Sequence, residues 1–81
     1  MNPPEKARAG LGLLKEAVCD YLAQHPDGRT NADVARDLQL ESDFQGQQKN
    51  YLSWSVLGLL VNEGKVRYDA RSGRKLYCLA S

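Results

Sequence analysis

The sequence predicts one small, mainly α-helical domain that ends in a short β-hairpin, an α+β fold. Its 81 residues leave room for one hydrophobic core and not for two independently folding domains. Apolar residues first recur at intervals of three and four, and after Gly64 β-branched and aromatic residues partly alternate with polar ones. The 42% hydrophobic content and the formal net charge of +1 exclude a disordered tail or a polycation.

The first helix is predicted from about Leu11 to the turn at His25–Gly28. Its apolar residues form one stripe, which comprises Leu11, Leu14, Val18, Tyr21 and Leu22. Asn2 suits the N-cap of an earlier start, but Gly10 and Gly12 weaken the first turns. The proline, aspartate and glycine of the turn end the helix.

The chain is therefore divided into a weakly helical N-terminal extension, residues 1–10, and a domain, residues 11–81. The extension lacks the apolar segment of a secretion signal. The longest apolar stretch, Val56–Val61, is far shorter than the ~20 residues that span a bilayer. We expect a cytoplasmic protein with no membrane partner, in which Cys19 and Cys78 stay reduced.

No metal site, cofactor or catalytic centre is predicted. The lone His25 and two distant cysteines lack the spacing of a structural zinc site. The acidic residues lack the spacing of a calcium loop, and there is no glycine-rich phosphate loop. No serine or cysteine is placed by the sequence against the histidine as a nucleophile. We therefore expect the chain not to be an enzyme.

The second helix is predicted to be short, from Thr30 or Asn31 to about Leu38. Thr30 or Asn31 can accept hydrogen bonds from its free backbone amides, and Asp33 places negative charge in the positive first turn. Arg29 and Thr30 leave room for a strand of one or two residues before it. The segment 41–46 breaks the periodicity and is predicted as a turn.

The third helix is predicted from about Gln47 to Glu63, with Gly64 as its left-handed C-terminal cap. Apolar residues cover most of its circumference, so we expect it to be packed on several sides. Trp54, and Phe44 before the helix, are predicted to lie in the core. One narrow face lacks aliphatic residues and is expected to meet solvent or a partner; it comprises Gln48, Tyr51, Ser55, Gly58 and Asn62.

The rest of the chain is predicted as a basic hairpin. Lys65–Tyr68 and Lys75–Leu79 have strand-forming residues, and Asp69–Arg74 has the residues of a turn. From Met1 to Gly64 there are six basic and nine acidic residues, whereas from Lys65 to Ser81 there are five basic and one acidic. The positive charge is therefore concentrated in the hairpin.

The order of these elements, with the residues that mark them, resembles the winged helix-turn-helix family. Gly28–Leu38 resembles the strand and second helix of that family, and Leu57–Val66 resembles the end of its recognition helix and the start of its wing. Gly73–Leu79 is similar to the returning wing strand. The resemblance covers about Leu11 to Leu79 and implies a three-helix winged helix-turn-helix fold that binds double-stranded DNA.

The expected DNA-binding surface combines the start of the third helix with the wing. Amide side chains pair with adenine edges in the major groove, and cations neutralise phosphates. The residues expected to contact or orient bases are Gln47, Gln48, Asn50, Tyr51 and Ser55. The residues expected to hold phosphates are Lys49, Arg67, Arg71, Arg74 and Lys75. The alternatives are a merely solvated helix start and a hairpin charged for solubility.

We therefore expect a small transcriptional regulator or a DNA-binding accessory protein. Its near-neutral charge predicts modest affinity for one copy, so a homodimer or a larger complex is expected. The alternative is a protein-interaction or dimerisation module of the same fold, favoured by the long segment 41–46 and by five acids from Asp27 to Asp43. An exposed Trp54 or Phe44, with wing arginines paired to acids of the second helix, would support this alternative.

Overall fold

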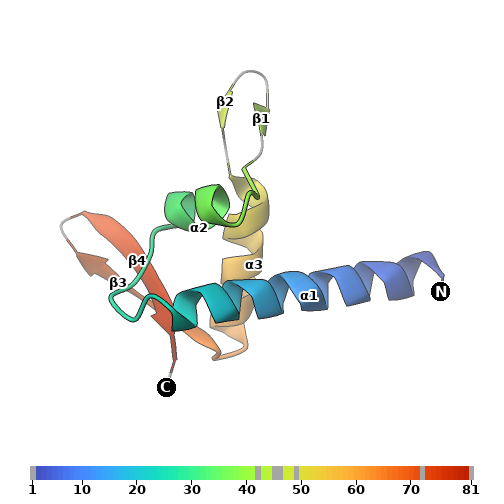
Figure 1. The fold of residues 1–81 in the computed structure, drawn as a ribbon, viewed down its shortest axis with the longest axis horizontal. Helices are drawn as coiled ribbons and strands as arrows, with labels where there is room; N and C mark the ends of the chain where they lie inside the picture. The colour runs from blue at the N-terminus through green and yellow to red at the C-terminus, as the bar shows by residue number, and fades with distance from the viewer. Residues whose placement is uncertain (1, 42, 45–46, 49, 72, 81) are drawn as a thin grey trace.

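The computed structural model describes residues 2–41, 43–44, 47–48, 50–71 and 73–80, with the backbone alone for 43–44 and 47–48. The described residues form three helices and two separate antiparallel pairs of strands, which confirms the α+β class. In chain order the elements in Figure 1 are α1 (Pro3–Ala23), α2 (Asn31–Asp37), β1 (Asp43–Phe44), β2 (Gln47–Gln48), α3 (Tyr51–Asn62), β3 (Val66–Arg71) and β4 (Arg74–Leu79).

Helix α1 begins at Pro3 rather than near Leu11. The side chain of Asn2 accepts a hydrogen bond from the backbone amide of Glu5 at 2.9 Å, which caps the helix as its position before a proline predicts. Residues 2–10 are exposed, and the first turns project away from the body of the fold (Figure 1). Because this extension has little tertiary packing, its helical conformation depends on local interactions such as the Asn2 cap.

The predicted start of α2 is confirmed by a reciprocal capping box. Thr30 Oγ1 accepts from the amide of Asp33 at 3.1 Å, and Asp33 Oδ2 accepts from the amide of Thr30 at 3.1 Å. The predicted short strand is also present, as a single bridge between Arg29 and Tyr77. Beyond α2, Gln39 takes a positive φ of 58° and Leu40 is half-buried.

The segment predicted as a turn before α3 contributes β1, which pairs with β2. Gln47 and Gln48 therefore belong to a strand, and the prediction that they begin the third helix is wrong. Asn50 has a φ of 54° and a ψ of 38°, a left-handed conformation through which an α-helix cannot continue. The helix accordingly begins at Tyr51. It ends at Asn62, one residue before the predicted end, and Gly64 follows as the predicted left-handed residue with a φ of 76°.

The hairpin of β3 and β4 has longer strands than predicted. Asp69 and Arg71 lie in β3 and Arg74 lies in β4, in a register that pairs Arg71 with Arg74 and Tyr68 with Tyr77. The predicted turn at Asp69–Arg74 is therefore wrong in its extent. The true connection is short and includes Gly73, whose φ of 74° suits a tight hairpin turn.

The core lies where the second half of α1, α2, α3 and the β3–β4 hairpin meet (Figure 1). Its largest fully buried apolar side chains are Val18, Leu22, Val34, Val56, Leu57 and Leu60. Each contributes about 1.5–3 kcal/mol by leaving water. Cys78 is buried and Cys19 is half-buried, and both are free thiols.

Trp54 is 58% exposed, so the prediction that it lies in the core is wrong. The buried stripe of α3 runs through Ser53, Val56, Leu57 and Leu60, and a rotation of about 100° per residue carries Trp54 to the side of that stripe. The side chain of Phe44 lies outside the described part of the chain. Within that part, no helix is long and apolar enough to cross a membrane.

Candidate nucleic-acid interface

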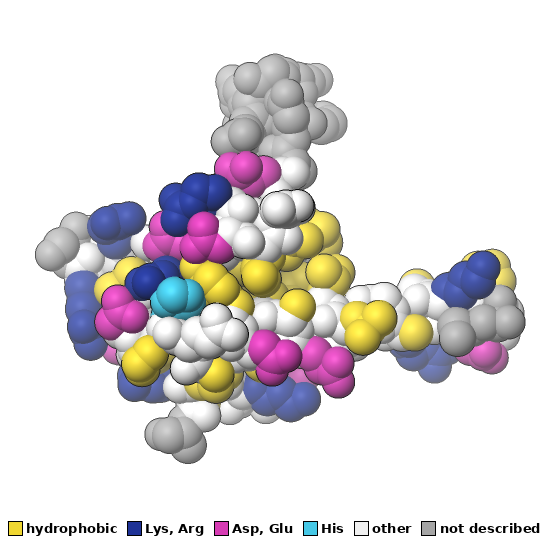
Figure 2. All heavy atoms as spheres, in the orientation of Figure 1, with side chains coloured by type: hydrophobic (Ala, Val, Ile, Leu, Met, Phe, Trp, Pro, Cys, Tyr) yellow, Lys and Arg dark blue, Asp and Glu magenta, His cyan; other side chains and the backbone are white. Residues whose placement is uncertain are grey.

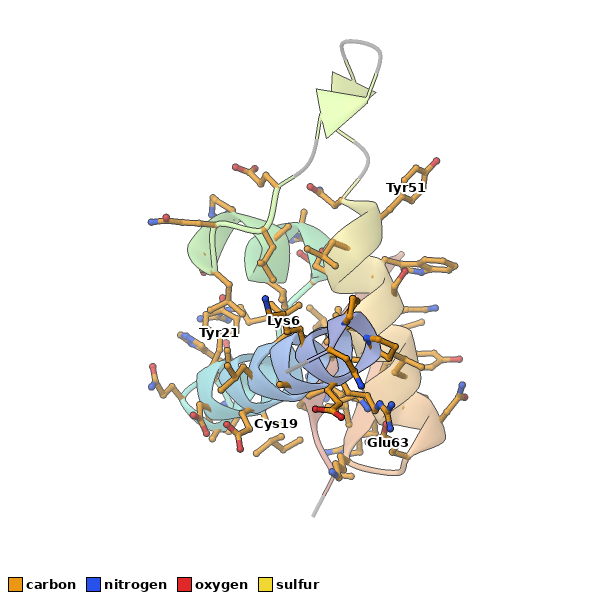
Figure 3. All side chains as sticks on the ribbon, turned by 90° about the vertical axis from the view of Figure 1, so that its right-hand side faces the viewer. Lys6, Cys19, Tyr21, Tyr51 and Glu63 are labelled. Atoms are coloured by element: carbon orange, nitrogen blue, oxygen red, sulfur yellow. The ribbon has the colours of Figure 1, made fainter. Side chains whose placement is uncertain are left out.

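The outward face of α3 is exposed and uncharged. Tyr51, Ser55, Gly58 and Asn62 are all exposed, as predicted for this face. Figure 3 shows Tyr51 projecting away from α1 and α2. No residue from Tyr51 to Asn62 is charged. The helix therefore offers partners aromatic, aliphatic and small polar groups.

Apolar side chains border this face. The exposed fractions are 58% for Tyr51, 44% for Leu52, 58% for Trp54 and 39% for Leu59. Exposed aromatic residues beside aliphatic ones often anchor an interaction. A molecule that covered α3 would therefore have to offer apolar or aromatic surface as well as polar groups.

Only one face of the β3–β4 hairpin is turned toward α3. Side chains alternate between the two faces of a strand, and Tyr68, Lys75 and Tyr77 share the face near α3. The ring centroids of Tyr68 and Tyr77 lie 5.8 Å apart. Lys75 Nζ lies 4.3 Å from the ring centroid of Tyr68, a cation–π contact that holds the ammonium group beside α3.

A groove of about 490 Å³ runs between α3 and this hairpin face. Trp54, Ser55 and Asn62 line it from α3, and Tyr68 and Lys75 line it from the hairpin. An adjoining hollow of about 390 Å³ shares Trp54, Lys75 and Tyr77 and adds Arg74 and the start of α2. We call the two together the α3–hairpin groove. Each volume lies within the range of about 300–1,000 Å³ that is common for ligand sites.

The hairpin cations divide into two groups. Arg67 and Arg71 pair with Asp69, at 3.3 Å and 3.8 Å between guanidinium nitrogen and carboxylate oxygen. Among the side chains that the structure describes, Arg74 and Lys75 form no ion pair with a carboxylate. These two cations line the α3–hairpin groove, and no aspartate or glutamate is among the described residues that line it.

Acidic side chains are concentrated elsewhere. Arg36 forms ion pairs with Asp33 and Asp37 on α2, at 3.1 Å and 3.0 Å between guanidinium nitrogen and carboxylate oxygen. A hydrogen bond from Tyr21, together with Arg36, holds the pKa of Asp37 below its ordinary value, so this carboxylate stays ionised at neutral pH. Figure 2 shows acidic and basic side chains mixed over the face that includes α2 and α1. The α2 surface is consequently unsuited to phosphates.

A small polar cluster fixes the start of α3 against α2. Ser53 Oγ donates to Asn31 Oδ1 at 2.7 Å, and Asn31 Nδ2 donates to the backbone carbonyl of Asn50 at 3.3 Å. Ser53 is completely buried. Asn50 Oδ1 is also buried and has no hydrogen-bond partner among the described residues. Asn50, predicted to contact bases, is thus half-buried and contributes to the junction of the two helices.

The structure gathers only part of the predicted site. Ser55, Arg74 and Lys75 meet at the α3–hairpin groove, and Tyr51 lies on the same helix outside it. By strand register the opposite face of the hairpin carries Arg67, Asp69, Arg71 and Arg74, and Arg74, beside the turn, also lines the adjoining hollow. Gln47 and Gln48 lie in β2, where only their backbone is described, and Lys49 lies outside the described residues.

Sequence reasoning missed Trp54 and Tyr68 as groove residues: it placed Trp54 in the core and Tyr68 in a strand. Tyr68 is 47% exposed. The angular position of Trp54 beside Ser55 and Gly58 was the available signal. The position of Tyr68 depends on strand register, which the sequence leaves open.

Comparison of the chain with known protein families, with curated proteins and with solved structures gives no match. Among the described residues, no group of three or more histidine, cysteine, aspartate or glutamate side chains is placed to hold a metal ion. The geometry and charge of the α3–hairpin groove are therefore the observations from which a function can be inferred.

Proposed function

We propose that this chain is a DNA-binding domain of the winged helix type and that the α3–hairpin groove is the centre of its DNA-binding surface. In this proposal α2 and α3 form the helix-turn-helix, β3 and β4 form the wing, and the protein acts as a small transcriptional regulator or DNA-binding accessory protein. The observation that supports it most is the position of Arg74 and Lys75. These cations lack a described carboxylate partner and border the uncharged face of α3.

The charge distribution defines the direction from which DNA approaches. Carboxylates on α2 repel phosphates, and Asp69 offsets the charge of Arg67 and Arg71 on the far face of the hairpin. The side formed by α3, Arg74 and Lys75 has no such opposing charge among its described residues. Two cations neutralise few phosphates, so one copy binds modestly and a homodimer or larger complex supplies the rest of the affinity.

The test is a titration of the purified chain with mixed-sequence duplex DNA at two salt concentrations. Arg74→Ala and Lys75→Ala are each expected to weaken binding to all sequences and to reduce the slope of log K against log salt by about one. Lys65→Ala is the matched control, because Lys65 pairs with Glu63 and lies outside the groove. Binding that is unchanged in both groove variants would contradict the proposed surface.

The exposure of Trp54 favours a second candidate, a protein-interaction or dimerisation module. The other feature expected of that module is missing, since the wing arginines that form described ion pairs bind Asp69 of their own strand rather than acids of α2. Under this candidate the duplex titration shows no binding, and sedimentation shows a self-associated chain that Trp54→Ala dissociates. A monomer at all concentrations, together with DNA binding, excludes it.

A further inference from the structure

The α3–hairpin groove combines an exposed indole with two cations. Trp54 lines both of its hollows, and so does Lys75. We propose that this groove binds an unpaired base of single-stranded DNA, which stacks on Trp54 while Lys75 and Arg74 hold the adjacent phosphates. This inference rests on the proposed function and narrows its substrate from DNA in general to a strand with unpaired bases.

Trp54 is the available stacking platform of the groove. Its side chain is 58% exposed, so a face of the indole can be covered by a planar base. The ring of Tyr68 is less available, because Lys75 Nζ already lies 4.3 Å from its centroid. Tyr77 is 4% exposed, and its ring packs beside the ring of Tyr68. One base against Trp54 therefore suits this geometry better than a stack of bases along the hairpin.

The same cation–π contact sets the position of the positive charge. It keeps the ammonium group of Lys75 on the groove side of the hairpin, and Trp54 lines the same two hollows as Lys75. Arg74 precedes it on the same strand and lines the adjoining hollow. A nucleotide has a flat apolar base and a phosphate close to it, so an aromatic face beside unpaired cations complements both parts.

The chemistry of α3 favours an unpaired strand over an intact duplex. Base edges in the major groove are recognised mainly by arginine, lysine, asparagine and glutamine. From Tyr51 to Asn62 the helix has one such residue, at its end, and its exposed middle has Trp54 and Leu59. In a duplex the base faces are stacked on each other, whereas an unpaired strand presents them to an indole.

The intrinsic fluorescence of the protein tests this directly, because Trp54 is the only tryptophan in the sequence. The purified chain is titrated at low salt with a short oligothymidylate and, separately, with a blunt duplex of the same length. We expect the oligothymidylate to quench the fluorescence and to bind more tightly than the duplex. Salt is expected to weaken the binding and to do so less in Lys75→Ala.

Variants separate stacking from simple hydrophobic contact. Trp54→Leu is expected to weaken binding of a dye-labelled oligothymidylate about tenfold, as loss of one stacked base predicts, whereas Trp54→Phe retains most of the affinity. Leu13→Ala is the matched control, since Leu13 is 67% exposed on α1 and does not line the groove. Circular dichroism of each variant confirms that it is folded, as expected for exposed positions.

The other possible outcomes contradict either this inference or the proposed function. Duplex binding without quenching by oligothymidylate overturns this inference and leaves the proposed function standing. Equal loss in Trp54→Phe and Trp54→Leu, or no loss in either, overturns stacking on the indole. Absence of binding to both oligonucleotides overturns the proposed function as well and favours the protein-interaction module.

Discussion

A single buried hydroxyl links the start of α3 to α2. Ser53 is completely buried, and its Oγ lies 2.7 Å from Asn31 Oδ1 and 3.2 Å from the carbonyl oxygen of Asn50. Its one proton can serve one of these acceptors at a time. Replacement by alanine leaves buried acceptors without that donor. The junction of α2 with α3 therefore depends on this side chain.

We expect Ser53→Ala to lower the free energy of unfolding by about 1–3 kcal/mol, the cost of a buried polar group that loses its partner. Ser55→Ala is the matched control on the same helix, because Ser55 is exposed, and its effect should stay within about 0.5 kcal/mol. Chemical denaturation of the three proteins measures both values. Equal stability of the two variants would show that the buried hydroxyl does not hold the helices together.

At the scale of elements, the first half of α1 is a helix with almost no tertiary support. A Cβ added at Gly10 or Gly12 would meet nothing within 4 Å. Gly10→Ala and Gly12→Ala should therefore each stabilise the local helix by about 0.5–1 kcal/mol. Amide hydrogen exchange should show greater protection of residues 6–10 in the variants, and Ala9→Gly should reduce it. Unchanged protection would contradict a helical first half.

Elements with local signals were predictable, and those that depend on pairing between segments were not. The capping box of Thr30 and Asp33 predicts the start of α2, and Gly64 predicts the end of α3. The start of α3 was misplaced because Gln47 and Gln48 are good helix formers in isolation. Their place in β2 depends on pairing with β1, and no local preference of a glutamine expresses that.

The candidate site was only partly predictable for a related reason. The hairpin cations were found from the charge gradient, but the separation of Lys75 from Arg67 and Arg71 follows from strand alternation. Arg67, Asp69 and Arg71 lie on one face of β3, a strand whose second half was predicted as a turn. The position of Trp54 was misjudged for a similar reason. Ser53 is buried in the stripe of α3 that meets the core, where an apolar side chain is usually expected, and Trp54 beside it is exposed.

At the scale of the whole molecule, ionisable groups away from the groove are expected to make the free energy of unfolding depend on pH at both ends of the range. Hydrogen bonds from Tyr21 and Arg36 lower the pKa of Asp37, and a hydrogen bond from Lys15 with the nearby charge of Lys65 lowers the pKa of Glu63. A carboxyl group with a lowered folded-state pKa stabilises the fold above its unfolded pKa. That stabilisation is lost as the pH falls through the folded pKa.

Tyr21 acts in the opposite direction. Its burial and its hydrogen bond to Asp37 raise its pKa, so its contribution is complete below the unfolded pKa and is lost as the pH rises through the folded pKa. The free energy of unfolding should therefore be highest between about pH 5 and pH 9 and decline on both sides. Denaturant titrations across the pH range measure this profile.

Two variants assign the declines to the contact between α1 and α2. Asp37→Asn removes the ionisable partner of Tyr21 and should flatten the acid side of the profile, and it should also reduce the alkaline decline because Asp37 helps raise the pKa of Tyr21. Tyr21→Phe should flatten the alkaline side most, since no phenol then ionises. Wild-type slopes in both variants would show that other groups control the pH dependence.

Neither Tyr21 nor Asp37 lines the α3–hairpin groove. The proposed DNA binding at neutral pH should therefore remain in both variants, so that a change in stability can be distinguished from a change in the groove.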